Sequence, residues 1–337
     1  MHELRLLSVV FGLGTVLLTY AAAKVTGMRE VWALSSGLFV ALYPKNLIAS
    51  SSVTNDALMI PLCALALVFF LLSERASLQG RFGHRRIHLA AMGLVLGAAT
   101  ITKLNSLVVA VILLVLAAIP ALVGLRRASA GSREARGSFL DVGLAVIGFF
   151  AVSGWWFVRN HHLYGQFLGT NASELYLRHS LLIPAPWSQH LVFGVFPSTV
   201  LDFSWYTQPN FFLPLRMNQA LAVLAVPCLL IGAWAMVWRR RWVSHTLIPL
   251  SAVSFLTCIV DGFVAVLIII KDTSIGDMRD ALFALSAFAI VITVGSARIF
   301  SRVSPRLELV GVSVWPVVLL ALDLYVFVRF LIPLGGL

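Results

Sequence analysis

The feature that most constrains this chain is a succession of long apolar runs separated by short polar breaks. Hydrophobic residues make up 60% of the 337 positions and charged residues only 12%, which leaves too little polar surface to cover a water-soluble core. In a bilayer, a run of about 20 apolar residues satisfies its backbone hydrogen bonds as a helix, whereas barrel strands would alternate polar and apolar residues. The runs are continuous, so we predict an all-α, polytopic integral membrane protein.

We predict about ten transmembrane helices in a single domain, 1–337, and the longest connection at 159–211. The first run is expected to be a retained helix, because it lacks the basic region and the cleavage site of a signal peptide. The fourth run is the shortest. The predicted spans are Leu4–Ala23, Val31–Ile48, Ala57–Ser73, Leu89–Ile101, Leu104–Leu125, Leu140–Val158, Phe212–Trp238, Thr246–Ile270, Ala281–Ile299 and Leu309–Leu334.

The orientation follows from the basic residues, because short cytoplasmic loops are enriched in Lys and Arg. Alternate connections hold 16 of the 25 basic residues, which places the connection 159–211 and both termini on the outer side. We therefore predict a multi-pass protein of the plasma (inner) membrane. The 16 residues are Lys24, Arg29, Arg75, Arg81, Arg85, Arg86, Arg126, Arg127, Arg133, Arg136, Arg239, Arg240, Arg241, Arg298, Arg302 and Arg306.

The net charge of +11 does not indicate nucleic-acid binding, because the basic residues form short clusters between apolar runs. The three cysteines, Cys63, Cys228 and Cys258, lie inside apolar runs without CxxC spacing, so we expect neither a zinc site nor a disulfide framework. The histidines His161, His162, His179 and His190 do not have the spacing of a helical metal site. The sequence shows no cofactor requirement, and no motif supports a divalent metal ion.

The first predicted outer connection brings several polar residues to the mouth of a helix. Thr54, Asn55 or Asp56 could simply cap that helix, whose positive end favours an acidic group. Alternatively, Asp56 also faces a polar site, and Lys45 supplies a cation at the depth of lipid phosphates. The residue types support both interpretations.

Two more outer connections carry candidate anion-binding groups. Lys103 lies at a reversal between two apolar runs, where it could snorkel to the interface or bind a phosphate or carboxylate. Arg159 and Asn160 follow the pair Trp155-Trp156, which is typical of an interfacial aromatic belt. The guanidinium of Arg159 offers a fork of donors that suits a phosphate oxyanion.

Two acids inside apolar runs, Asp261 and Asp323, suggest a different class of function. Carboxylates within a membrane are costly to desolvate and often carry function, so a secondary transporter is an alternative. The chain shows neither repeat symmetry nor paired broken helices, both of which are typical of such transporters.

The order of five motifs along the chain resembles the membrane region of GT-C glycosyltransferases. The resemblance is to the bacterial relatives of protein O-mannosyltransferases and of the lipid A aminoarabinose transferase. It covers nearly the whole chain, and the order of the motifs carries it, since each alone is weak. The motifs are Arg5-Leu6-Leu7-Ser8, Asn55-Asp56-Ala57-Leu58, Gly97 to Lys103, Trp155 to Gly165, and Met278-Arg279 with Phe283-Ala284-Leu285.

The resemblance implies a GT-C-like helical bundle that transfers a sugar from a polyprenyl-phosphate donor to a glycan, lipid or protein acceptor on the outer side. It implies that membrane lipid and the lipid-linked sugar are partners and that nucleic acid is not. The cations Lys45, Lys103, Arg159 and Arg279 would hold the phosphate, whose departure as an anion must be stabilised. Asp56 would order the site or the acceptor, and the expected substrate-binding set also includes Asn55 and Asn160.

The sequence departs from the family's pattern in two places. It begins where the family's second helix would begin, so we expect it to lack the first helix and the acidic first outer loop. Asp56 is the best remaining acidic candidate, and the catalytic residue stays unassigned. The last outer motif reads Met278-Arg279-Asp280, with Ser286 in place of a proline. A non-catalytic paralogue or membrane subunit therefore stays open beside the enzyme.

Overall fold

A computed structural model describes residues 2–127, 133–168, 215–238, 249–254, 256–257 and 282–331. Within these ranges the regular structure is helical and no strand occurs. The amino-terminal helices are α1 (His2–Val25), α2 (Glu30–Ala41), α3 (Pro44–Ser51), α4 (Asn55–Leu78), α5 (Phe82–Thr102), η1 (Leu104–Ser106), α6 (Leu107–Arg127) and α7 (Arg133–Tyr164). The carboxy-terminal elements are α11 (Leu215–Trp238), α13 (Leu285–Val303), η5 (Pro305–Leu307), α14 (Glu308–Val326) and the π-helical η6 (Phe327–Leu331).

Five helices in the described part of the chain are long and apolar enough to cross a membrane. They are the helical segments His2–Val25, Asn55–Leu78, Phe139–Tyr164, Leu282–Val303 and Pro305–Arg329. Each predicted span that falls on described residues is helical, while most of the eighth, Thr246–Ile270, lies outside them. The chain is an integral membrane protein with an all-α, polytopic fold, as its sequence predicts.

The second predicted span, Val31–Ile48, is wrong as a single helix. The structure divides it into α2, which ends at Ala41, and α3, which begins at Pro44. Proline lacks a backbone N–H and disfavours helical geometry in the residue before it, so Pro44 starts a new helix more readily than it continues one. Tyr43, the residue before it, has the extended angles φ −74° and ψ 119°.

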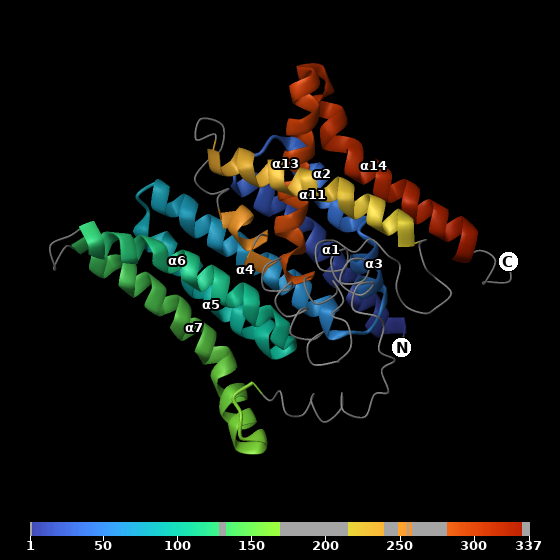
Figure 1. The fold of residues 1–337 in the computed structure, drawn as a ribbon. Coiled ribbons are helices and arrows are strands. Elements are labelled where there is room, and N and C mark those ends of the chain that lie inside the picture. The colour runs from blue at the N-terminus through green and yellow to red at the C-terminus, as the bar shows by residue number, and fades with distance from the viewer. Residues whose placement is uncertain are drawn as a thin grey trace, which may run out of the picture.

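Helices α4, α5 and α7 form a layer in which α5 lies between the other two (Figure 1). The chain crosses between α5 and α7 through α6, so α5 and α7 run parallel. Two glycines of α5 make their contact very close: a Cβ on Gly97 would lie 2.5 Å from the Phe149 carbonyl oxygen, and one on Gly93 would collide with the Ala145 carbonyl. Small residues spaced by four allow two membrane helices to approach backbone to backbone.

This layer has two chemically different ends. At one end lie the start of α4 and the end of α5, and we call this the Lys103 end. At the other lie the end of α4 and the starts of α5 and α7, which we call the Arg85 end. The predicted topology puts the Lys103 end on the outer side and the Arg85 end in the cytoplasm.

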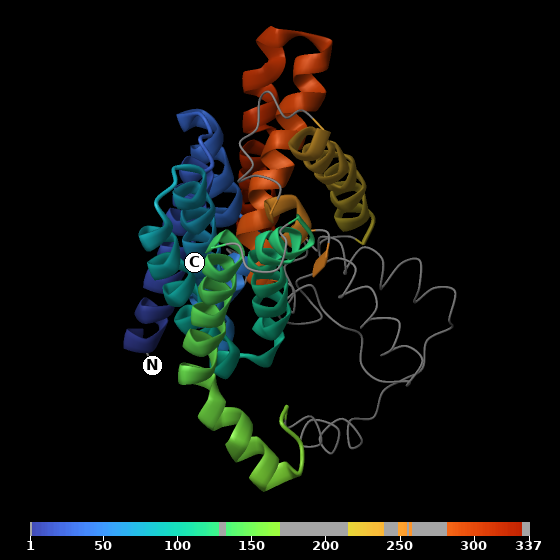
Figure 2. The ribbon, with the colours of Figure 1, turned by 90° about the vertical axis from the view of Figure 1, so that its left-hand side faces the viewer.

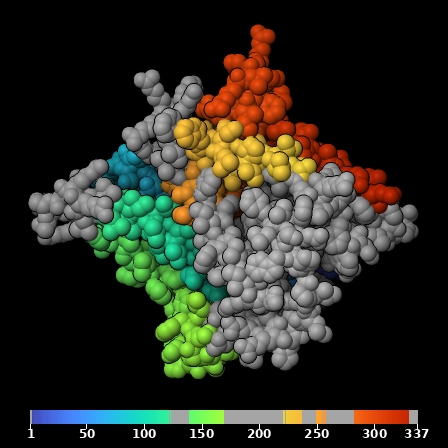
Figure 3. Space-filling view, viewed as in Figure 1, coloured from blue at the N-terminus to red at the C-terminus, as the bar shows by residue number. Residues whose placement is uncertain are grey.

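Helix α13 occupies the interior of the bundle. Within its apolar window 89% of the residues are buried, against 28% for α7, so α13 contacts protein where α7 faces lipid. Gly232 of α11 and Gly295 of α13 allow these two helices to approach closely, and Thr19 of α1 hydrogen-bonds to Ser286 of α13 at 2.7 Å. On the face shown in Figure 3, α11 lies at the surface beside the carboxy-terminal helices.

Candidate functional site

A buried ion pair joins two of the predicted site residues at the Lys103 end. The Nζ of Lys103 donates a hydrogen bond to the Oδ1 of Asp56 at 2.8 Å. The Asp56 side chain is 1% exposed and that of Lys103 is 18% exposed. A charge removed from water is costly unless it is paired, so each of these groups depends on the other.

The ends of two helices place this pair. Helix α4 begins at Asn55, which puts Asp56 in its first turn, where the helix dipole favours a negative charge. Helix α5 ends at Thr102, and Lys103 leaves it in an extended conformation, φ −152° and ψ 125°. Asn55 ties the two ends together, because its Nδ2 donates to the Thr102 carbonyl at 3.4 Å.

The structure bears on the capping interpretation at Thr54, one of its three candidate residues. Thr54 occupies the N-cap position of α4, but no side-chain hydrogen bond caps the helix there. The carboxylate of Asp56, one residue into the helix, accepts the hydrogen bond from Lys103.

Arg159 and Asn160 lie near the end of α7 and differ in exposure. Gly97 is level with Phe149 in the parallel α5–α7 pair, so Lys103 is level with Trp155. Arg159 is about one helical turn, roughly 6 Å, further along the axis. Arg159 is exposed, whereas Asn160 is buried and donates from Nδ2 to the Phe167 carbonyl at 3.4 Å.

Lys45 lies in the first turn of α3 and is only 4% exposed. Helix α3 contacts both α1 and α4, which puts Lys45 in the same part of the molecule as the start of α4. Its neighbour Asn46 donates from Nδ2 to the Val40 carbonyl at 3.0 Å and so bridges the break between α2 and α3. Arg279 and Asp261 lie outside the described residues.

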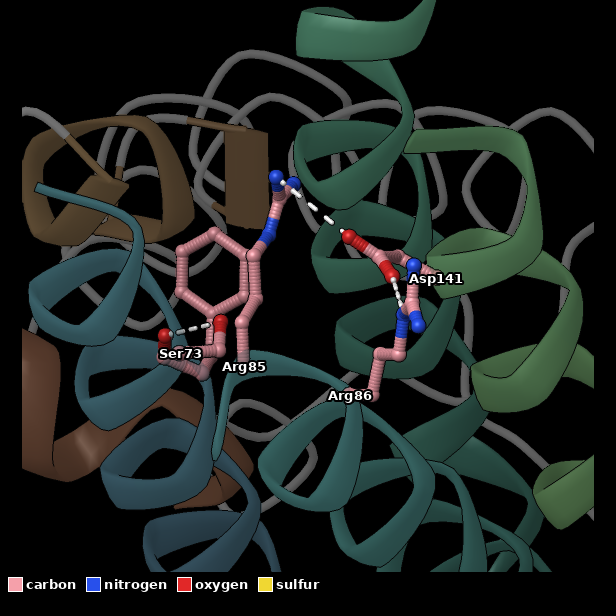
Figure 4. Close-up of polar contacts among 5 residues, drawn as sticks. Ser73, Arg85, Arg86 and Asp141 are labelled. Atoms are coloured by element: carbon pink, nitrogen blue, oxygen red, sulfur yellow. Dashed lines mark hydrogen bonds and ion pairs between the residues drawn. The ribbon is translucent and has the colours of Figure 1, made fainter. Parts of the chain in front are cut away.

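The Arg85 end holds a second buried cluster, which the sequence interpretation missed. The two carboxylate oxygens of Asp141 each face a different arginine (Figure 4): Oδ2 lies 3.5 Å from Nη1 of Arg85, and Oδ1 lies 3.0 Å from Nε of Arg86. Arg85 and Asp141 are 4% and 3% exposed, and Arg86 is 41% exposed. The available signal was an acid at the start of a predicted span, since such a group needs a partner.

The described part of the chain holds no group of three or more His, Cys, Asp or Glu residues that could bind a metal ion. His161 and His162 are neighbours at the end of α7, and His179 and His190 lie outside the described residues. The described residues of the Lys103 end bring together a partly buried lysine and a buried carboxylate.

These features define a polytopic helical membrane protein whose α4–α5–α7 layer buries an ion pair at each end. Residues 1–217 match the family model of dolichyl-phosphate-mannose-protein mannosyltransferase. Because this match covers more than half of the 337 residues, the chain belongs to that family. The predicted membership among GT-C glycosyltransferases is confirmed.

Solved structures of two proteins are similar to this chain. The oligosaccharyltransferase of Archaeoglobus fulgidus, solved with Zn and sulfate, is 15% identical with a TM-score of 0.46, over 94% of this chain and 39% of its own. ArnT from Cupriavidus metallidurans is 17% identical: the apo structure has a TM-score of 0.34 over 88% of this chain and 65% of its own, and the structure bound to undecaprenyl phosphate has 0.35 over 92% and 64%. A comparison with curated protein sequences gives no significant match.

Proposed function

We propose that this protein transfers a sugar from a polyprenyl-phosphate donor to an acceptor at the outer surface of the plasma membrane. The buried Lys103–Asp56 pair carries the proposal, because it holds a cation at the end of the bundle that the predicted topology places outside. Family membership supports sugar transfer as the reaction class.

In this proposal Lys103 binds the phosphate that leaves the sugar. Breaking the bond between the sugar and the phosphate concentrates negative charge on the departing oxygen, and a positioned cation stabilises that charge. The ammonium of Lys103 would supply N–H donors as well as a positive charge to the phosphate. Lys45, Arg159 and Arg279 are the further cations that we assign to the phosphate, and Asn55 and Asn160 complete the set.

We assign Asp56 the role of orienting Lys103. Its carboxylate is 1% exposed and is engaged by the lysine, so it is poorly placed to take a proton from an incoming acceptor. The lipid-linked sugar carries its own leaving group, the polyprenyl phosphate. The acceptor is a glycan, lipid or protein hydroxyl or amine at the outer surface.

The test is binding of an undecaprenyl phosphate to the purified full chain in nanodiscs. Lys103→Ala is expected to weaken binding by about 1.5–3 kcal/mol, the range for a hydrogen bond to a charged group, or roughly tenfold to a hundredfold in Kd. Lys24→Ala is the matched control, because Lys24 is paired with Glu30 at 2.9 Å where α1 joins α2, on the Arg85 side of the bundle. If the wild type, Lys103→Ala and Lys24→Ala all bound undecaprenyl phosphate with equal affinity, Lys103 would not be part of the phosphate site.

A further inference from the structure

The end of α7 extends beyond its membrane-crossing part. Its apolar portion, Leu140–Val158, is about 19 residues or ~28 Å long, which matches the roughly 30 Å hydrocarbon core of a bilayer. The helix continues to Tyr164, about 9 Å further at 1.5 Å per residue. In two views at right angles, these last turns reach past the ends of the neighbouring helices (Figures 1 and 2).

Residues 161–168, which we call the α7 hook, then fold back on the helix. Gly165 has the left-handed angle φ 68°, and its N–H donates to the His161 carbonyl at 2.9 Å, which ends the helix and reverses the chain. The ring of Phe167 stacks on that of His161 with centroids 4.6 Å apart and planes 11° apart. Together with the bond from Asn160 to its carbonyl, this stacking returns Phe167 to the level where the apolar run ends.

The α7 hook exposes large apolar side chains all around its reversal. Phe167 and Leu163 are each 58% exposed, and Tyr164 and Leu168 are each 41% exposed. The outward face of α7 leads directly to them, because Ile147, Phe150, Trp155 and Val158 are exposed in the same way along the span. This continuity makes the surface of the α7 hook an extension of the lipid-facing surface of the helix.

We infer that the α7 hook is an interfacial anchor, in which Phe167 and Leu168 insert into the boundary between lipid headgroups and acyl chains at the Lys103 end. Its composition fits that layer, since Tyr and His place an apolar body in lipid and a polar edge in water. Interfacial segments bind by burying apolar side chains about 5–10 Å into the boundary. The inference does not depend on the proposed sugar transfer.

Spin labels on single cysteines of the full chain in phosphatidylcholine nanodiscs test the inference. Cys63, Cys228 and Cys258 are first replaced by Ala, and Phe167→Cys and Leu168→Cys are labelled in turn. Val158→Cys is the lipid reference, and Gln79→Cys, in the exposed turn between α4 and α5, is the water reference. At 167 and 168 we expect oxygen to relax the spin labels more strongly than a water-soluble nickel chelate does, which is also the expected result at the lipid reference 158. At the water reference 79 the nickel chelate should relax the label more strongly than oxygen.

Two results would overturn the anchor. Nickel access at 167 and 168 as high as at 79 would place the α7 hook in water. Low access to both oxygen and nickel would mean that protein covers it, either a second copy or another part of this chain. Because a label on Phe167 removes its stacking with His161, Leu163→Cys is a second probe: it leaves that stacking intact and should give the same order as 158.

Discussion

The ammonium of Lys103 and the carboxylate of Asp56 lie 2.8 Å apart, although 47 residues separate them in the chain. The pair fastens the end of α5 to the first turn of α4. It therefore contributes to stability as well as to any anion site, and the two contributions can be measured separately.

Replacing Asp56 with Asn should destabilise the protein, because the mostly buried ammonium of Lys103 loses its carboxylate. Breaking a buried pair typically costs 3–5 kcal/mol, and the partial exposure of Lys103 reduces our expectation to about 2–3 kcal/mol. Thermal unfolding in detergent measures the loss. The double variant Asp56→Asn/Lys103→Met should recover most of it, and an unchanged unfolding midpoint in Asp56→Asn alone would contradict the buried pair.

Replacing Gly97 with Val should separate α5 from α7, since a Cβ at Gly97 would lie 2.5 Å from the Phe149 carbonyl oxygen, which cannot move independently of its helix. Overpacking of this kind costs about 1–3 kcal/mol, and contact with backbone favours the upper end. Gly143→Ala on α7 is the control, because no atom lies within 4 Å of its added Cβ. It should be neutral or stabilise by up to about 1 kcal/mol through helix propensity. A comparable loss of unfolding free energy in Gly97→Val and Gly143→Ala would disprove the close contact between α5 and α7.

Replacing Asp141 with Asn should remove the carboxylate that both Arg85 and Arg86 face, which leaves Glu74 as an acid that still attracts Arg85. A buried charge that loses its counter-ion typically lowers the free energy of unfolding by about 3–5 kcal/mol, and the remaining attraction to Glu74 reduces our expectation to about 2–3 kcal/mol. Arg86→Gln should cost less than about 1 kcal/mol, because Arg86 is 41% exposed and Arg85 still faces the carboxylate. Chemical unfolding in micelles compares the two variants. If Arg86→Gln lowered the free energy of unfolding more than Asp141→Asn, Arg86 rather than Arg85 would be the main partner of Asp141.

The ion pair between Arg29 and Glu308 joins the start of α2 to the start of α14 at 2.6 Å, and Trp32 donates to the same carboxylate at 3.2 Å. Glu308→Gln should nevertheless cost no more than about 1 kcal/mol, since Arg29 is 71% exposed and water screens the pair. The cost should shrink further in about 1 M salt, where the Debye length is about 3 Å. A loss that salt does not change would point to packing of Trp32 as the dominant contribution.

The helices were predictable because apolar runs in lipid have one way to satisfy their backbone groups. The break at Pro44 was missed because the predicted span continued past Lys45 and Asn46 to the apolar residues Leu47 and Ile48. The same holds for α7, whose helix passes Arg159 and reaches Tyr164 although the apolar run ends at Val158. Proline geometry at Pro44 and the hydrogen-bonded turn at Gly165, rather than hydropathy, set these boundaries.

The residues of the candidate site could be predicted from the sequence, but the contacts between them could not. Asp56 and Lys103 were each identified by charge at a helix end, yet their contact depends on how the α4–α5 hairpin closes. Gly93 and Gly97 are visible in the sequence as a spaced pair, but the spacing does not say which helix they meet. Asp141 was overlooked because its partners precede it by 55 and more residues.

The contact between α5 and α7 also bears on the order in which the bundle assembles. A membrane chain is made from its amino terminus, so α5 enters the bilayer while its partner has yet to be synthesised. Before α7 is synthesised, the face of α5 that carries Gly93 and Gly97 lacks the helix against which it packs in the finished protein. Arg85 likewise lacks its ion pair with Asp141. We therefore expect α5 to remain without its final contacts, with its arginine end in water, while α6 is synthesised. Chains whose synthesis stops before residue 141 should thus be extracted from the membrane or degraded more easily than chains that include α7.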